Sequence, residues 1–138
     1  MKLMSYLVAT AVILLAQTSL VCSQEISIEK LPPVVVKTVP EAGQETIDAS
    51  LTEIRVVFSK PMMVQSWSWG KLNDEAFPEI DKSRPIRFDA DQKTAILPVK
   101  LEKNRTYAIW LNTANLQNFK DNTGQPAVPY LLVFKTGL

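Results

Sequence analysis

The sequence predicts an all-β protein built as a Greek-key sandwich of two packed sheets. Apolar residues recur at every second position in short runs, and turn-forming residues separate these runs every 8–15 positions. The apolar spacing of a helix is not sustained over any stretch of 12 or more residues. The runs number about seven within roughly 100 residues, which is typical of a domain made of two antiparallel sheets.

Residues 1–23 have the pattern of a signal peptide. Lys2 supplies a positive charge, an apolar stretch follows, and small residues precede the expected cleavage after Ser23. Two alternatives stay open. One is lipidation of Cys22, for which residues 19–22 form a weak lipoprotein box, and the other is retention of the segment as an uncleaved anchor. We therefore expect an exported protein that is periplasmic, on the cell surface or secreted.

The composition argues against several kinds of site. The chain has no histidine, and its one cysteine, Cys22, lies in the leader, so histidine triads, thiol nucleophiles and the usual zinc and copper ligand sets are excluded. Met62 and Met63 alone do not make a copper site. Basic residues number 15 and acidic residues 14, and Lys2 is the only charged residue of the leader. The exported part is thus neutral, which does not suit nucleic-acid binding, and we expect no metal and no cofactor.

Residues 24–32 are polar, end in proline and predict a linker, so the domain is expected to span residues 33–138. The first strand, residues 33–39, is β-branched and bounded by prolines, which suits the edge of a sheet. The later strands are predicted at residues 51–58, 66–69, 86–88, 93–99, 105–111 and 130–136. Residues 89–92 predict a hairpin turn, and residues 71–83 and 112–129 predict long loops.

The alternation of the predicted strands assigns ten side chains to the core. They are Val35, Ile54, Val56, Phe58, Phe88, Leu97, Tyr107, Ile109, Leu132 and Phe134. Tyr107 also follows a turn position at Asn104 and lies near the start of the penultimate strand. This placement is typical of a tyrosine corner, in which the phenol forms a hydrogen bond with an upstream backbone group. An ordinary strand tyrosine is the alternative. With the strand count, this spacing predicts an immunoglobulin-like Greek-key β-sandwich of about seven strands.

Six segments share a further pattern. They are Pro33-Val-Val-Val, Pro40-Glu-Ala-Gly43, Leu51 with Ile54-Arg-Val-Val-Phe-Ser-Lys-Pro-Met62, Leu101 with Tyr107-Ala-Ile-Trp-Leu111, Asp121 with Gly124, and Phe134-Lys-Thr136. Together they resemble the bacterial Ig-like domain family of surface-layer and other exported proteins. The resemblance implies a β-sandwich that serves as a spacer or adhesive module, usually in tandem arrays and without catalysis. A single such domain is expected here, which favours binding over spacing.

Apolar side chains gather on one predicted outer sheet face. They are Ala108, Trp110, Leu131, Val133 and one of the pair Trp67 and Trp69. An exposed patch of this kind is typical of a surface that binds protein or sugar, so Trp67, Trp69, Trp110, Leu131 and Val133 are the candidate binding residues. Two alternatives stay open: one of the long loops covers the face, or Trp67 and Trp69 belong to the core.

The sequence thus predicts an exported, non-catalytic Ig-like module that binds or scaffolds at the cell envelope. The expected partner is an envelope protein or polysaccharide, and the membrane is contacted only through a lipid on Cys22, if one is attached. The alternative is a small enzyme or inhibitor that acts on envelope polymers through its loops, which would need a concave site with carboxyl groups of shifted pKa. The paired acidic residues at 89 and 91, and at 121 beside Asn122, indicate turns more than calcium sites.

Overall fold

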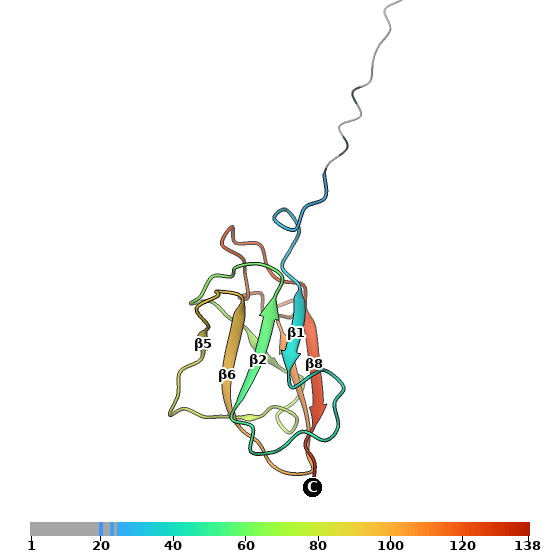
Figure 1. Ribbon diagram of the computed structural model, residues 1–138, viewed down its shortest axis with the longest axis vertical. Coiled ribbons are helices and arrows are strands. Elements are labelled where there is room, and N and C mark those ends of the chain that lie inside the picture. Colours follow the sequence, from blue (N-terminus) through green and yellow to red (C-terminus); the bar gives the residue numbers. More distant parts are fainter. Residues whose placement is uncertain (1–19, 21–22, 24) are drawn as a thin grey trace, which may run out of the picture.

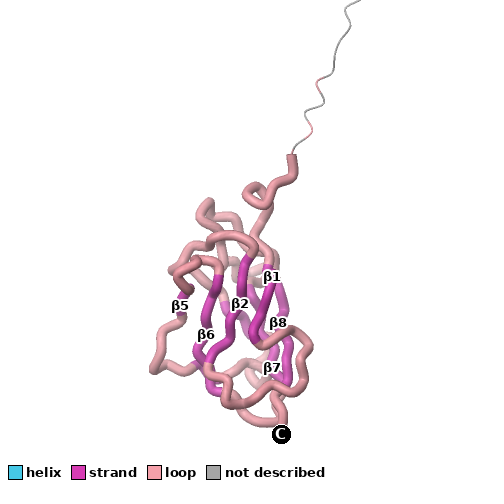
Figure 2. Tube along the Cα trace, viewed as in Figure 1, coloured by secondary structure: helices cyan, strands magenta, loops and turns pink. Residues whose placement is uncertain are grey.

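The computed structural model describes residues 20, 23 and 25–138, which form two antiparallel sheets (Figures 1 and 2). The strands are β1 (Val35–Val39), β2 (Glu53–Phe58), β3 (Trp69–Lys71), β4 (Glu79–Ile80), β5 (Arg87–Phe88), β6 (Thr94–Lys100), β7 (Thr106–Leu111) and β8 (Tyr130–Lys135). One sheet has the order β1-β2-β6-β4, with β5 also paired to β6, and the other has the order β3-β7-β8. The predicted sandwich is confirmed, with eight strands in the part of the chain that the structure describes, where the sequence predicted about seven.

The predicted leader lies almost entirely outside the described residues. Cys22 and the cleavage position therefore receive no structural account, and lipidation stays a prediction. Among residues 20, 23 and 25–138, no helix is long and apolar enough to cross a membrane.

The alternation of β2 shows how the sequence produces the two layers. Ile54, Val56 and Phe58 are fully buried, whereas Arg55 and Val57 between them are partly exposed on the outer face. Successive side chains of a strand point to opposite faces, so every second residue of β2 enters the core. Seven other predicted core residues follow the same rule. Leu97, Tyr107, Ile109, Leu132 and Phe134 are buried, and Val35 and Phe88 are half-buried against the same cluster.

Tyr107 forms the predicted tyrosine corner. Its phenol oxygen accepts a hydrogen bond of 2.8 Å from the backbone N–H of Glu102, five residues upstream. The ring is fully buried and packs on Phe134 with a centroid separation of 5.5 Å. This bond fixes the turn between β6 and β7, and the structure confirms the reading of Tyr107 as a corner residue.

The largest differences from the predicted strands lie between β2 and β5, while the other strands begin or end within two residues of the predicted positions. The third strand begins at Trp69 instead of residue 66, because Trp69 pairs with Leu111 and Gly70 with Trp110. Residues 71–83, predicted as a loop, contain the two-residue strand β4, in which Glu79 and Ile80 pair with the end of β6. A strand this short shows no alternation that a sequence pattern could reveal.

The chain changes sheets after β1. Residues 43–47 run beside β8, where the N–H groups of Gly43 and Ile47 donate to Val133 and Lys135, and the N–H of Lys135 donates to Gln44. This segment therefore covers the outer edge of β8, whereas β1 pairs with β2 alone among the described strands. The chain enters the sandwich at one end and leaves it at the other (Figure 1).

Candidate binding surface

The outer face of the β3-β7-β8 sheet brings together three of the five predicted binding residues. Trp110 lies opposite Leu131 on the neighbouring strand, and Ala108 lies opposite Val133. Trp110, Leu131 and Val133 are all partly exposed, so they form an accessible apolar strip, named here the β7–β8 strip. Ala108 is buried, and its N–H donates to the carbonyl of Ala76 at 2.9 Å. The segment after β3 thus covers one end of this face and leaves Trp110 accessible.

The absence of a side chain at Gly70 allows Trp110 to pack closely against β3. Gly70 lies opposite Trp110 on β3, and a Cβ added at Gly70 would come within 3.0 Å of the Trp110 Cβ. Such a contact is tighter than ordinary van der Waals packing, so a side chain at position 70 would require Trp110 to shift. The position of Trp110 on this face therefore depends on the glycine at position 70.

Replacement of Gly70 by alanine is expected to lower the free energy of unfolding by about 1–3 kcal/mol, because the new methyl group overlaps Trp110. Urea denaturation followed by circular dichroism measures this difference. Gly137→Ala is the matched control, since a Cβ there meets backbone atoms only at 3.9 Å. Equal stability of the two variants would show that Trp110 is not held by Gly70.

Trp67 and Trp69 do not join the β7–β8 strip. Both pack against the core, and the Trp69 ring meets Phe119 edge-on at a centroid distance of 5.2 Å. The register explains this placement, because Trp69 is the partner of Leu111, whose side chain is fully buried. Trp67 and Trp69 therefore pack against the core, as in the second alternative left open by the sequence.

A buried ion pair was not predicted from the sequence. The Lys60 ammonium lies 2.6 Å from the Asp121 carboxylate, with side-chain exposures of 10% and 3%. Lys60 also donates to the carbonyl of Glu29 at 3.1 Å. The Asp121 carboxylate also accepts the backbone N–H groups of Thr123 and Gln125, each at 2.9 Å. The pair joins the loop after β2, the loop before β8 and the segment before β1.

The pKa of Asp121 is lowered far below its ordinary value. Burial by itself raises this pKa, but the hydrogen bonds from Lys60, from the Thr123 hydroxyl and from the backbone N–H groups outweigh burial. Asp121 is therefore a carboxylate in the folded protein at neutral pH. Its bonds to Thr123 and Gln125 also confirm that residues 121–124 form a turn.

The outer face of the other sheet has a different character. Glu53 faces three arginines, with contacts of 2.7 Å to Arg55, 3.3 Å to Arg87 and 3.9 Å to Arg84. Ile96 lies between Arg55 and Arg87 in the register and is only 1% exposed, although it is not part of the main core. Long arginine stems cover apolar surface in this way while their charged ends stay in water. Asp89 and Asp81 pair with Arg55 and Arg84 in addition, so this face is polar and charge-balanced.

The carboxyl groups with a shifted pKa do not resemble those of an acid–base site. Among the described residues, the carboxyl groups with a clearly shifted pKa are those of Asp48, Glu53, Asp81, Asp91 and Asp121, and in each the pKa is lowered. At Asp91 the Thr94 hydroxyl bond is the largest cause, and the N–H groups of Lys93 and Thr94 add to it. A carboxylate held ionised is not a proton donor at neutral pH. Among residues 20, 23 and 25–138, no group of three or more acidic, histidine or cysteine side chains could hold a metal ion.

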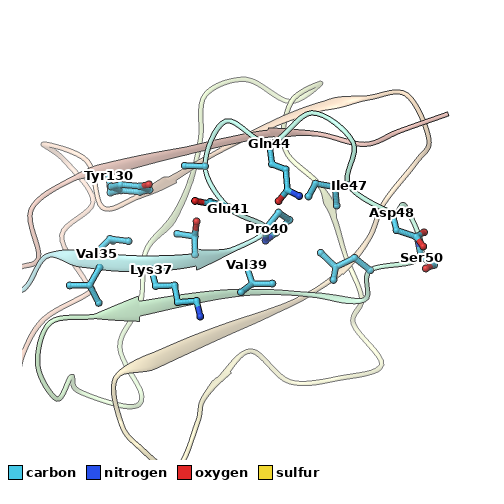
Figure 3. A pocket seen from close by; sticks show the side chains of 14 residues that line it. Val35, Lys37, Val39, Pro40, Glu41, Gln44, Ile47, Asp48, Ser50 and Tyr130 are labelled. Carbon is cyan, nitrogen blue, oxygen red and sulfur yellow. The ribbon is translucent and has the colours of Figure 1, made fainter.

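An open groove of about 850 Å³ lies between β1 and the segment that follows it (Figure 3). Tyr130 and Val35 lie at one end, and Asp48 and Ser50 lie at the other. Its wall along β1 includes Val36, which is 59% exposed. This groove was not predicted from the sequence, because the return of residues 43–47 to β8 has no local pattern.

The comparison with protein families identifies the family of this chain. Residues 29–136 match the family described as Bacterial Ig-like domain, and the chain belongs to this family. Two solved structures are similar. A crystal structure of the S-layer protein rSbsC(31-844) has a TM-score of 0.48 and 18% identity, over 78% of this chain and 14% of that one. Domains 1–6 of the surface layer protein SbsC have a TM-score of 0.46 and 17% identity, over 79% and 14%.

The chain thus spans about a seventh of those surface-layer chains. No curated protein matches the sequence. The family assignment confirms the resemblance found in the sequence, and it confirms the β-sandwich.

Proposed function

We propose that this protein is an exported, non-catalytic Ig-like module that binds or scaffolds at the bacterial cell envelope through the β7–β8 strip. The observation that supports it best is the accessible Trp110, which lies beside Leu131 on a sheet face and opposite a residue without a side chain. Tryptophan is enriched among the residues that contribute most to binding. The membership in the Bacterial Ig-like domain family and the predicted signal peptide support the envelope as the location.

The positions of the chain ends also support a scaffolding role. The segment before β1 leaves at one end of the sandwich and the C-terminus lies at the other (Figure 1). A module of this kind keeps the groups attached to its two ends apart, whether these are a neighbouring domain or an anchor and a bound partner. The proposal applies to both arrangements.

The location is tested by cell fractionation and mass spectrometry of the N-terminus. We expect the protein in the exported fraction with a mass that corresponds to residues 24–138, or to a lipid-bearing chain that begins at Cys22. Full-length protein that stays in the cytoplasm would contradict the proposed location.

Binding is tested with isolated cell envelopes and with purified cell-wall polysaccharide as separate probes. Trp110→Ala is expected to weaken binding to one of them by at least about tenfold, because a tryptophan at the centre of an interface contributes strongly. Trp110→Phe should retain part of the affinity. Leu72→Ala is the matched control, since it removes an exposed apolar side chain that is not part of the strip. Unchanged binding of Trp110→Ala to both probes would contradict a role for this surface.

A further inference from the structure

The edges of the two sheets differ in how they are covered. Among the described residues, β8 is paired on its outer side by residues 43–47, while β3, β4 and β5 are at most three residues long. Within the part of the chain that the structure describes, β1, with five residues, is the longest edge strand that pairs on one side only. An uncovered edge presents N–H and C=O groups that can accept a further strand.

The uncovered edge of β1 forms one wall of the groove described above (Figure 3). Its exposed side chains are mostly apolar, because Val36 and Val39 are exposed while Thr38 is buried. Val35, Pro40 and Tyr130 continue the apolar lining inward. This edge therefore offers both backbone groups and a place for apolar side chains, which is what strand addition requires.

A segment with the complementary pattern precedes β1. Ile26 and Ile28 alternate with Glu25 and Ser27, and the two isoleucines are 82% and 66% exposed. In an extended conformation both isoleucines point to the same side, so they would enter one groove together. Isolated exposed apolar residues are common, but two large β-branched ones at strand spacing are typical of a segment that pairs with another strand.

The segment is held away from the groove of its own chain. The N–H groups of Lys30 and Leu31 donate to the carbonyl of Ser27, and Lys60 binds the carbonyl of Glu29. These contacts place the segment at the end of the sandwich where β1 begins, and from there it extends away from the strands (Figure 2). It is therefore positioned to reach a second molecule.

We propose that residues 25–28 of one copy of this chain add as a strand to the β1 edge of a second copy, with Ile26 and Ile28 in its groove. Four residues span about 14 Å, which β1 matches in length. Lys37 lies on this edge and Glu25 lies in the segment, so the two surfaces carry opposite charges, while the acidic groups of the groove, Glu41 and Asp48, come after β1. Because segment and groove are different surfaces, the contact is head-to-tail and extends into chains.

The association between copies does not depend on the proposed envelope role. It is tested with a protein of residues 24–138, which contains every described strand and core residue. Sedimentation velocity over a range of concentrations should show a monomer that forms dimers and longer chains as the concentration rises. Ile26→Ser/Ile28→Ser should raise the dissociation constant by at least about tenfold, because two apolar side chains no longer leave water. Val36→Glu should do the same from the acceptor side.

A mixing experiment distinguishes this arrangement from other contacts. The double serine variant keeps its groove and Val36→Glu keeps its segment, so a mixture of the two should form a dimer that does not grow further. Val36→Ile and Leu72→Ser are the controls and should associate as the unmodified chain does. Circular dichroism verifies that each variant is folded. A chain that stays monomeric at millimolar concentration, a double serine variant that associates normally, or a mixture without dimers would overturn the proposal.

Discussion

Replacement of Asp121 by asparagine is expected to lower the free energy of unfolding by about 3–5 kcal/mol, because the buried Lys60 ammonium loses its counter-charge. Small domains have only about 5–15 kcal/mol in total, so this variant would be close to unfolding. Urea denaturation at neutral pH measures the change. The double variant Lys60→Met/Asp121→Asn should cost less than the sum of the two single variants, since it removes both charges. Strictly additive losses would show that the two groups are not coupled.

The same pair predicts a pH dependence with a definite sign. The pKa of Asp121 is lower in the folded protein than the value of about 3.9 in an unfolded chain, so the unfolded state binds its proton first. The stabilisation is therefore complete at neutral pH and is lost as the pH falls below about 4. The difference in stability between the unmodified chain and Asp121→Asn should shrink on acidification. A difference that stays constant from neutral pH to about pH 3 would contradict the ionised state of Asp121.

The fold was predictable because its main strands obey one rule with period two. In β2 and β8, every second side chain enters the core, and the sequence alone shows this alternation. Tyr107 was predictable because the corner is local, with its bond only five residues away. The strand β4 was not predictable, since its pairing depends on the end of β6 and not on its own two residues.

The binding surface was predictable in part. Trp110 and Leu131 were assigned to one outer face because the alternation of β7 and β8 sets that face. The positions of Trp67 and Trp69 depend on where β3 begins, and the pairing of Trp69 with Leu111 decides this, not the local pattern. Contacts between distant loops have no sequence signal of this kind. Asp121 lies in a predicted turn and Lys60 follows a predicted strand, but nothing in either local sequence indicates that the two residues pair.

Asn112 is another residue whose role only the three-dimensional structure reveals. It follows β7, is fully buried and has a positive φ of 59°, a conformation that asparagine adopts more readily than most residues. Its side-chain amide donates to the carbonyls of Phe119 and Ala127 and accepts the N–H of Phe119. One side chain thus joins both arms of the loop of residues 112–129. That loop places Phe119, which was not predicted as a core residue, against Phe58 at 5.1 Å.

Asn112→Ala is accordingly expected to lower the free energy of unfolding by about 4 kcal/mol, because the Phe119 N–H and the Ala127 carbonyl each stay buried without their side-chain partner. Asn112→Gly loses the same hydrogen bonds but tolerates the positive φ, so it should be about 1 kcal/mol more stable than the alanine variant. Urea denaturation of both variants separates the two contributions. Since the loop also positions Phe119 against Trp69, near-ultraviolet circular dichroism should change in both. Stability close to that of the unmodified chain would show that the loop is held by its apolar contacts and not by Asn112.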